Sequence, residues 1–186
     1  MRTISRITLV LTILATFMPS VRADQRDQRL DPLFVALADA PGVSEAAAIE
    51  RNIWVIWSLR PDDRRANALM LKGVTEMSQS QMPAALDSFT RLTRLAPDFA
   101  EAWNKRATVL YLLGRLEESV IDVKRTLKLE PRHFGALSGL GLIYLAVGQP
   151  EIALKALDAA LAIHPQMPGP REKAEQLRDD LKGRKL

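Results

Sequence analysis

The sequence predicts an all-α protein built as a solenoid of antiparallel helix pairs. Prolines recur with a spacing of 34 residues, at Pro97, Pro131 and Pro165. Small residues keep the same spacing, as at Gly114 and Gly148. Each period also holds two stretches with helical apolar periodicity, such as 100–113 and 116–129. A repeated helix pair cannot bury its apolar face alone, so we expect successive pairs to stack.

Residues 1–23 predict a secretory signal peptide that is cleaved after Ala23. Basic residues precede a 12-residue apolar run, Ile7–Met18, and Val21-Arg22-Ala23 provides small residues at the cleavage positions. A membrane anchor is the alternative, but this run is shorter than the roughly 20 residues that span a bilayer. The chain contains no cysteine, which excludes a lipid-modified cysteine, a disulfide framework and a thiolate nucleophile.

The charge of the remaining chain disfavours nucleic acid as a partner. The whole sequence has a formal net charge of +4, and residues 1–23 contribute three arginines and no acidic residue. The expected mature chain therefore has a net charge of about +1. Nucleic-acid-binding proteins need a concentrated basic face, which this balance does not provide.

The region 24–65 is expected to form an N-terminal helical hairpin, either a degenerate repeat or a cap. Residues 24–30 are polar and are expected to be loose. A short helix over about 31–40 is followed by the turn sequence PGVS. Ser44 can then cap a second helix that extends to about residue 59.

Two tryptophans in this hairpin, Trp54 and Trp57, are three residues apart and share a helix face. One interpretation is that both pack inside the chain, against Leu69 and its neighbours. The other is that they form an exposed anchor for a partner protein, because tryptophan is enriched at binding hot spots.

Three repeat units follow, over residues 66–99, 100–133 and 134–167. The third unit carries the most complete pattern: Leu137, Leu140, Gly141, Tyr144, Gly148, Ala153, Leu157, Ala160 and Pro165. This pattern resembles the tetratricopeptide repeat (TPR) family, whose unit has 34 residues. The first unit departs most, with Glu76 at the place of the aromatic residue. The resemblance implies a right-handed superhelix that binds other proteins in a concave groove.

Local residue chemistry supports the expected helix ends. A proline cannot donate the amide that a continuing helix needs, so each second helix should stop at its periodic proline. Asp98 and Glu101 suit a capping arrangement that begins the next helix. Gly141 and Ala153 are expected to face each other where two helices approach closely, with Tyr144 filling the wider end of that pair.

The family resemblance also implies which residues face the groove. They belong to the first helix of each unit: Met70, Val74, Met77, Asn104, Lys105, Thr108, Tyr111, Ser138, Leu142 and Leu145. Apolar side chains with few polar groups suit an extended or helical peptide. Two states remain open, because the hairpin or the C-terminal helix could cover part of this groove.

One binding mode of TPR domains is not expected in this chain. Domains that clamp the carboxylates of a peptide C-terminus use lysine, asparagine and arginine at fixed places. The corresponding residues here are Met70, Val74, Lys105, Gly135 and Gly139. Recognition of chaperone tails is therefore not expected.

Residues 168–186 predict a capping helix over the last repeat. Leu177 and Leu181 are four residues apart, with charged residues on the other faces. A basic tail for a membrane surface is the alternative, but acidic residues balance the basic ones.

The residues do not predict a catalytic, metal or cofactor site. His133 and His164 are the two histidines, and both are expected in turns next to the repeat prolines. Adjacent acidic pairs, such as Glu117 and Glu118, point about 100° apart on a helix and do not converge on a substrate. The glycines follow the repeat period and form no phosphate-binding loop.

We therefore expect a non-enzymatic protein–protein interaction module, an adaptor or assembly factor exported to a bacterial periplasm. The periplasmic placement comes from a resemblance to exported bacterial TPR proteins. The alternative is a structural subunit of a cell-envelope complex that is anchored through Trp54 and Trp57. No membrane span is expected after signal cleavage, and the sequence leaves the oligomeric state open.

Overall fold

The computed structural model of the chain describes residues 24–183, so the predicted signal peptide lies outside the described residues. Every regular element in this range is an α-helix. The helices are α1 (Leu30–Ala38), α2 (Val43–Trp57), α3 (Arg64–Ser78), α4 (Met82–Leu95), α5 (Ala100–Leu112), α6 (Leu116–Leu129), α7 (Phe134–Ala146), α8 (Pro150–Ile163) and α9 (Pro168–Gly183). Within the described range, no helix has the length and apolar character needed to cross a membrane.

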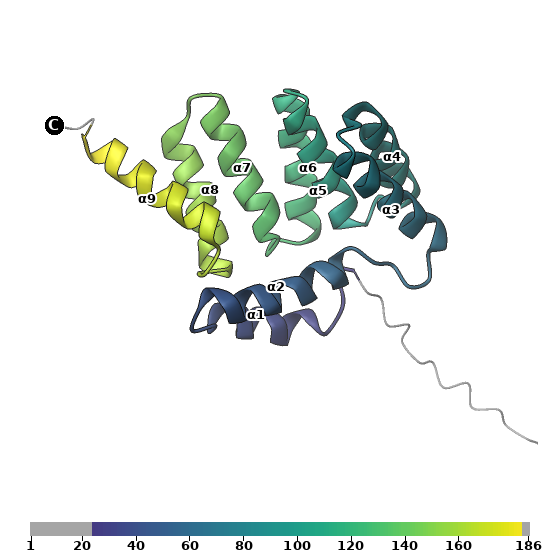
Figure 1. The fold of residues 1–186 in the computed structure, drawn as a ribbon, viewed down its shortest axis with the longest axis horizontal. Helices are drawn as coiled ribbons and strands as arrows, with labels where there is room; N and C mark the ends of the chain where they lie inside the picture. Colours follow the sequence, from purple (N-terminus) through teal and green to yellow (C-terminus); the bar gives the residue numbers. More distant parts are fainter. Residues whose placement is uncertain (1–23, 184–186) are drawn as a thin grey trace, which may run out of the picture.

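Helices α3 to α8 form three antiparallel pairs that stand side by side (Figure 1). The pairs are α3–α4, α5–α6 and α7–α8, and each packs against the next. Helix α9 covers the last pair, where Ala174 and Leu177 join a cluster with Ala153 and Leu157 of α8. The prediction of an all-α solenoid with a C-terminal capping helix is confirmed.

Proline and glycine separate the helices as their chemistry requires. Helices α4, α6 and α8 each end two residues before a periodic proline. Gly114 and Gly148 connect the two helices of their pairs with φ of 74° and 71°, a left-handed conformation that glycine adopts without steric cost. Ser80 takes the equivalent place in the first pair, with φ of 58°.

Close helix–helix contacts explain the small residues inside the pairs. A Cβ atom at Gly141 would lie 2.7 Å from Leu157 Cγ and 3.4 Å from the Ala153 carbonyl oxygen. In the first pair, a Cβ at Gly73 would lie 2.6 Å from the Phe89 ring. The expected approach of Gly141 and Ala153 is therefore present.

Replacing Gly141 by leucine is expected to lower the free energy of unfolding by about 1–3 kcal/mol, because the new side chain overpacks the contact with Leu157. Chemical denaturation measures the change. Gly139→Ala is the matched control, since a Cβ there meets nothing within 4 Å and alanine favours helix. Equal stability of Gly141→Leu and the wild type would contradict the close contact.

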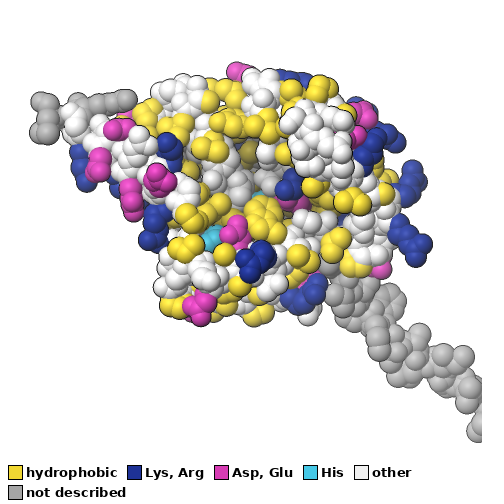
Figure 2. Space-filling model, in the orientation of Figure 1, with side chains coloured by type: hydrophobic (Ala, Val, Ile, Leu, Met, Phe, Trp, Pro, Cys, Tyr) yellow, Lys and Arg dark blue, Asp and Glu magenta, His cyan; other side chains and the backbone are white. Residues whose placement is uncertain are grey.

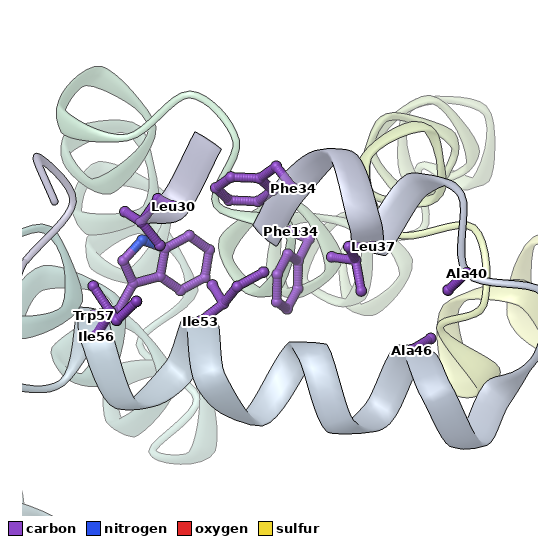
Figure 3. Packing of buried hydrophobic residues seen from close by; sticks show 9 residues of the cluster. All are labelled: Leu30, Phe34, Leu37, Ala40, Ala46, Ile53, Ile56, Trp57 and Phe134. Atoms are coloured by element: carbon purple, nitrogen blue, oxygen red, sulfur yellow. The ribbon is translucent and has the colours of Figure 1, made fainter. Parts of the chain in front are cut away.

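The α1–α2 hairpin lies across one end of the solenoid instead of continuing the stack ahead of α3 (Figure 1). Phe134 of α7 completes the apolar core between α1 and α2, next to Phe34 and Trp57 (Figure 3). The half-buried Ile163 and Met167 pack against the same core. The hairpin therefore covers the turns that join successive repeats and does not occupy a repeat position itself.

Two sequence expectations about the hairpin are wrong. Gly42 is the N-cap of α2, so Ser44 does not cap that helix. Residues 24–29 are ordered, and the side chains of Asp24, Gln25 and Asp27 are buried. Both misses have one cause: the polar side chains of this segment bond to a turn about 70 residues away in sequence.

Gln25 supplies a bond that the start of α5 lacks. The N-cap of α5 is Phe99, which has no side chain that can accept from the first-turn amides. Gln25 Oε1 instead accepts from Ala100 N at 3.3 Å, and Gln25 Nε2 donates to the Asp98 carbonyl oxygen at 2.6 Å. The expected capping by Asp98 and Glu101 is therefore wrong, because a side chain from outside the repeat takes that role.

Asp98 joins the hairpin to the first repeat junction through two arginines. Its carboxylate lies 2.8 Å from Arg60 Nη1, at the end of the hairpin, and 2.8 Å from Arg26 Nη2, at its start. Hydrogen bonds from Arg60, opposed by burial, and then from Arg26 hold the pKa of Asp98 at about 2. A carboxylate with a lowered pKa stabilises the folded state above its ordinary pKa of about 4.

Asp98→Asn is expected to loosen the hairpin at neutral pH, because it removes the charge that both arginines contact. Hydrogen exchange should show a loss of protection in α1 and α2 that exceeds the loss in α7 and α8. In the wild type, the same contribution should disappear as the pH falls from about 4 to 2. Asp87→Asn is the control, since Asp87 forms an exposed pair with Arg91 at 3.9 Å. Unchanged protection in Asp98→Asn would show that this cluster does not hold the hairpin.

Candidate binding groove

A hollow of about 200 Å³ lies between α5 and α7 on the face formed by the first helices of the pairs. The predicted groove residues that line it are Asn104, Thr108, Tyr111, Ser138 and Leu142. They converge because residues three or four apart lie on one face of a helix, and α5 and α7 are first helices of adjacent pairs. Figure 2 shows hydrophobic side chains around a depression between the solenoid and the hairpin.

Other predicted groove residues have different positions. Met70 is buried in the core between α3 and α4, and the half-buried Met77 packs against the same core. Leu145 packs in the cluster that α8 forms with the capping helix α9. Val74 is exposed but does not line the hollow. The flexible methionine side chains fill gaps in the core of the first pair, so they are not available to a groove ligand.

Lys105 is held at the end of the groove by a buried acidic residue. Its Nζ lies 3.1 Å from Glu101 Oε1, and Glu101 is fully buried. Asn104 Nδ2 donates to Glu101 Oε2 at 2.9 Å, and His133 Nε2 lies 2.9 Å from the same oxygen. Burial raises the pKa of Glu101, but the attraction of Lys105 and the bonds from His133 and Asn104 outweigh it and leave that pKa lowered.

His133 has a structural role that its position in a turn does not reveal. It is the N-cap of α7, and its Nδ1 accepts from Ala136 N at 3.1 Å. Since Nδ1 accepts, the ring proton must be on Nε2, which donates it to Glu101. His133 therefore ties the start of α7 to the start of α5.

The two tryptophans pack inside the chain. Trp57 is 1% exposed and stacks on His133 with a centroid distance of 4.1 Å. Trp54 lies edge-on to Phe134 and donates from Nε1 to Glu50 at 2.9 Å. The expected packing against Leu69 is wrong in its partner, because the hairpin lies across the repeat junctions. Trp57 is not an exposed anchor in this structure.

Trp54 closes one end of the groove. A Cβ atom at Gly135, which lines the hollow, would lie 2.7 Å from Trp54 Cη2. Lys105 Nζ lies 5.4 Å from the centroid of the Trp54 ring. No residue of α1, α2 or α9 lines the hollow itself, so the hairpin bounds the groove without filling it.

Sequence reasoning did not assign Gly135 and Gly139 to the wall of the groove. It treated them only as places where a carboxylate clamp lacks its basic side chains. Glycine inside a helix is unfavourable, so two glycines in one short helix were the signal that could have identified this wall. Within the described residues, no group of three or more histidine, aspartate or glutamate side chains could hold a metal ion.

The sequence model of the tetratricopeptide repeat matches residues 70–123 and 122–168. The chain belongs to the tetratricopeptide repeat family. A TPR repeat-containing protein of Rhizobium etli is 35% identical over 156 residues, which are 84% of this chain and 76% of that protein. Superkiller complex protein 3 of Mus musculus is 29% identical over 92 residues, which are 50% of this chain and 6% of that protein.

Solved TPR structures share the fold. The first TPR domain of Spaghetti (RPAP3), bound to the HSP90 peptide SRMEEVD, has a TM-score of 0.62 and 21% identity, covering 65% of this chain and 96% of that domain. MamA has a TM-score of 0.60 and 17% identity, covering 75% of this chain and 79% of that chain. These identities support the TPR fold and no closer relation.

The TPR groove of this chain differs from a carboxylate clamp in the structure as well as in the sequence. Lys105 is the basic residue at a clamp place, and it is paired with Glu101. Met70 is buried, and Gly135 and Gly139 carry no side chain. This TPR domain therefore presents a neutral groove between α5 and α7.

Proposed function

We propose that this TPR protein is a non-enzymatic adaptor or assembly factor that binds an extended or helical segment of a partner protein between α5 and α7. The observation that carries the proposal is the hollow lined by Asn104, Thr108, Tyr111, Ser138 and Leu142. These side chains are mostly apolar or neutral, and neither the hairpin nor α9 lines the hollow. Such a surface suits a peptide whose apolar residues anchor it in a groove.

We also propose that the protein is exported to the periplasm of a bacterium. The apolar run Ile7–Met18 and the small residues at positions 21 and 23 support this placement. The 35% identical relative comes from a bacterium, Rhizobium etli. Mass spectrometry of the protein from the envelope fraction should find Asp24 as the N-terminal residue. A chain that retains residues 1–23 and stays in the cytoplasm would contradict export.

The groove can be tested by replacing Tyr111 and Leu142 together with alanine. We expect the double variant to lose its partner after crosslinking in the native compartment, because both side chains line the hollow. Circular dichroism should stay unchanged, since neither residue belongs to the buried core. The matched control is Leu71→Ala with Ile121→Ala, two exposed aliphatic residues outside the hollow. Recovery of the partner by the groove variant would contradict this function.

A second function, a structural subunit of a cell-envelope complex, is favoured by the outer face of the hairpin. A hollow of about 440 Å³ there is lined by Pro32, Leu33, Val55 and Ile56 together with two polar residues. Val55 is 57% exposed. In this alternative, Trp54 and Trp57 hold the hairpin in place, and its outer face contacts the complex. Loss of the partner in Val55→Asp but not in the groove variant would favour it.

A further inference from the structure

One glycine of the groove has no explanation in the packing of the chain. Gly73, Gly135 and Gly141 each lie where a Cβ atom would be within 3 Å of another side chain. Gly139 is also inside a helix, but a Cβ there would meet nothing within 4 Å. Glycine in this position destabilises a helix relative to alanine. What Gly139 does provide is a bare stretch of α7 backbone at the wall of the hollow.

A buried acceptor lies in the same hollow. The side chain of Asn104 lines it, and the residue is 7% exposed. Its Nδ2 donates to Glu101, while no side-chain or backbone donor among the described residues bonds to its Oδ1. Buried polar atoms in proteins are normally hydrogen-bonded. The Oδ1 atom can therefore accept a hydrogen bond from a group that enters the hollow.

The charges around the hollow favour a neutral occupant. Lys105 is paired with Glu101 at 3.1 Å, and Arg106 is paired with Asp122 at 2.6 Å. A charged group entering the hollow would lose its hydration without finding an unpaired opposite charge. The neutral wall therefore matches an uncharged group.

The size and position of the hollow limit the occupant further. A volume of about 200 Å³ exceeds that of a 150 Å³ apolar cavity that binds benzene, so one large side chain fits. At the Gly135 end, Trp54 blocks any continuation. An occupant would therefore continue the apolar interface that the hairpin already forms with α7.

We propose that this hollow is a socket for one aliphatic side chain, such as leucine, isoleucine or methionine, from the partner segment. The backbone of the segment passes over Gly139, and one of its amides donates to Asn104 Oδ1. This inference rests on the proposed function of the groove. It adds the chemistry that decides which segment binds.

The test selects peptides from a displayed library of random linear sequences on the full chain. The selected peptides are expected to share one aliphatic position. Changing that residue to lysine, or methylating the neighbouring backbone amide, should weaken binding by about tenfold to a hundredfold. Gly139→Leu, which fills the socket from the protein side, should weaken binding to the same extent.

Gly169→Leu is the matched control, because Gly169 is also an open helical glycine but lies in α9, outside the hollow. It should leave the dissociation constant unchanged, and melting curves should show that both leucine variants fold. Peptides that bind Gly139→Leu as well as wild type, or that share a charged residue, would overturn the socket and leave the groove function standing. If no selected peptide is sensitive to Tyr111→Ala with Leu142→Ala, the groove function and the socket both fail.

Discussion

Replacing Trp57 by alanine is expected to lower the free energy of unfolding by about 3–5 kcal/mol, the loss typical of a large buried aromatic residue. Trp57 stacks on His133, and its ring centroid lies 5.9 Å from Phe34 and 5.2 Å from Phe134. The side chain therefore joins α1 and α2 to the start of α7, and no nearby side chain can fill the cavity without moving one of these helices. Denaturant unfolding measures the loss.

Trp103→Ala provides the control for this prediction. Trp103 is half-buried on α5, with the Arg106 guanidinium 4.8 Å from its ring centroid and no contact with the hairpin core. Its removal should cost clearly less stability than the removal of Trp57. Equal losses in the two variants would mean that the hairpin does not dock on the solenoid in solution.

Glu101→Ala is expected to destabilise the protein by a similar amount, about 3–5 kcal/mol, because removing one member of a buried charged cluster leaves the others unpaired. The variant would leave Lys105 without its carboxylate, and it would remove the acceptor of His133 Nε2 and Asn104 Nδ2. Glu101→Gln keeps the volume and removes only the charge, so it should lose less. Both losses can be measured by chemical denaturation at pH 7.

The pH dependence separates the charge of Glu101 from its packing. Its pKa in the folded protein is lowered, so its charge stabilises the fold above the ordinary pKa of about 4.5. This contribution should be lost as the pH falls below that value, and the stability difference between wild type and Glu101→Gln should shrink there. Glu118→Gln is the control, an exposed residue that pairs with Arg115 at 2.7 Å. A difference that stays constant with pH would mean that the charge of Glu101 contributes nothing.

The repeat architecture could be predicted because each of its signals is local and occurs several times. The prolines end helices through backbone chemistry that does not depend on distant residues. Gly114 and Gly148 turn the chain through a left-handed conformation, and Gly141 admits the Leu157 side chain. Any one of these residues would be a weak signal, but the 34-residue spacing makes the same statement at each repeat.

The groove could be predicted only in its central part. Asn104, Thr108 and Tyr111 line the hollow because α5 has a neighbouring pair on each side, which fixes the face that it turns to the groove. In α3 the same helix spacing places Met70 in the core, since no repeat precedes it in the stack. Leu145 is covered in a cluster with the capping helix. Periodicity identifies a helix face, but the neighbours of that face decide whether it is core or groove.

The sequence by itself determined the helix pairs, their repeat length, their stacking into a solenoid and the capping helix at its end. Only the tertiary structure decided the place of the N-terminal hairpin and, with it, the closed end of the groove. The reason is the range of the interactions: Gln25 bonds to Asp98, Glu50 lies 3.3 Å from His164, and Gln166 donates to the Ala40 carbonyl oxygen. These contacts join residues 73 to 126 positions apart, and each occurs once, so no periodic pattern in the sequence announces them.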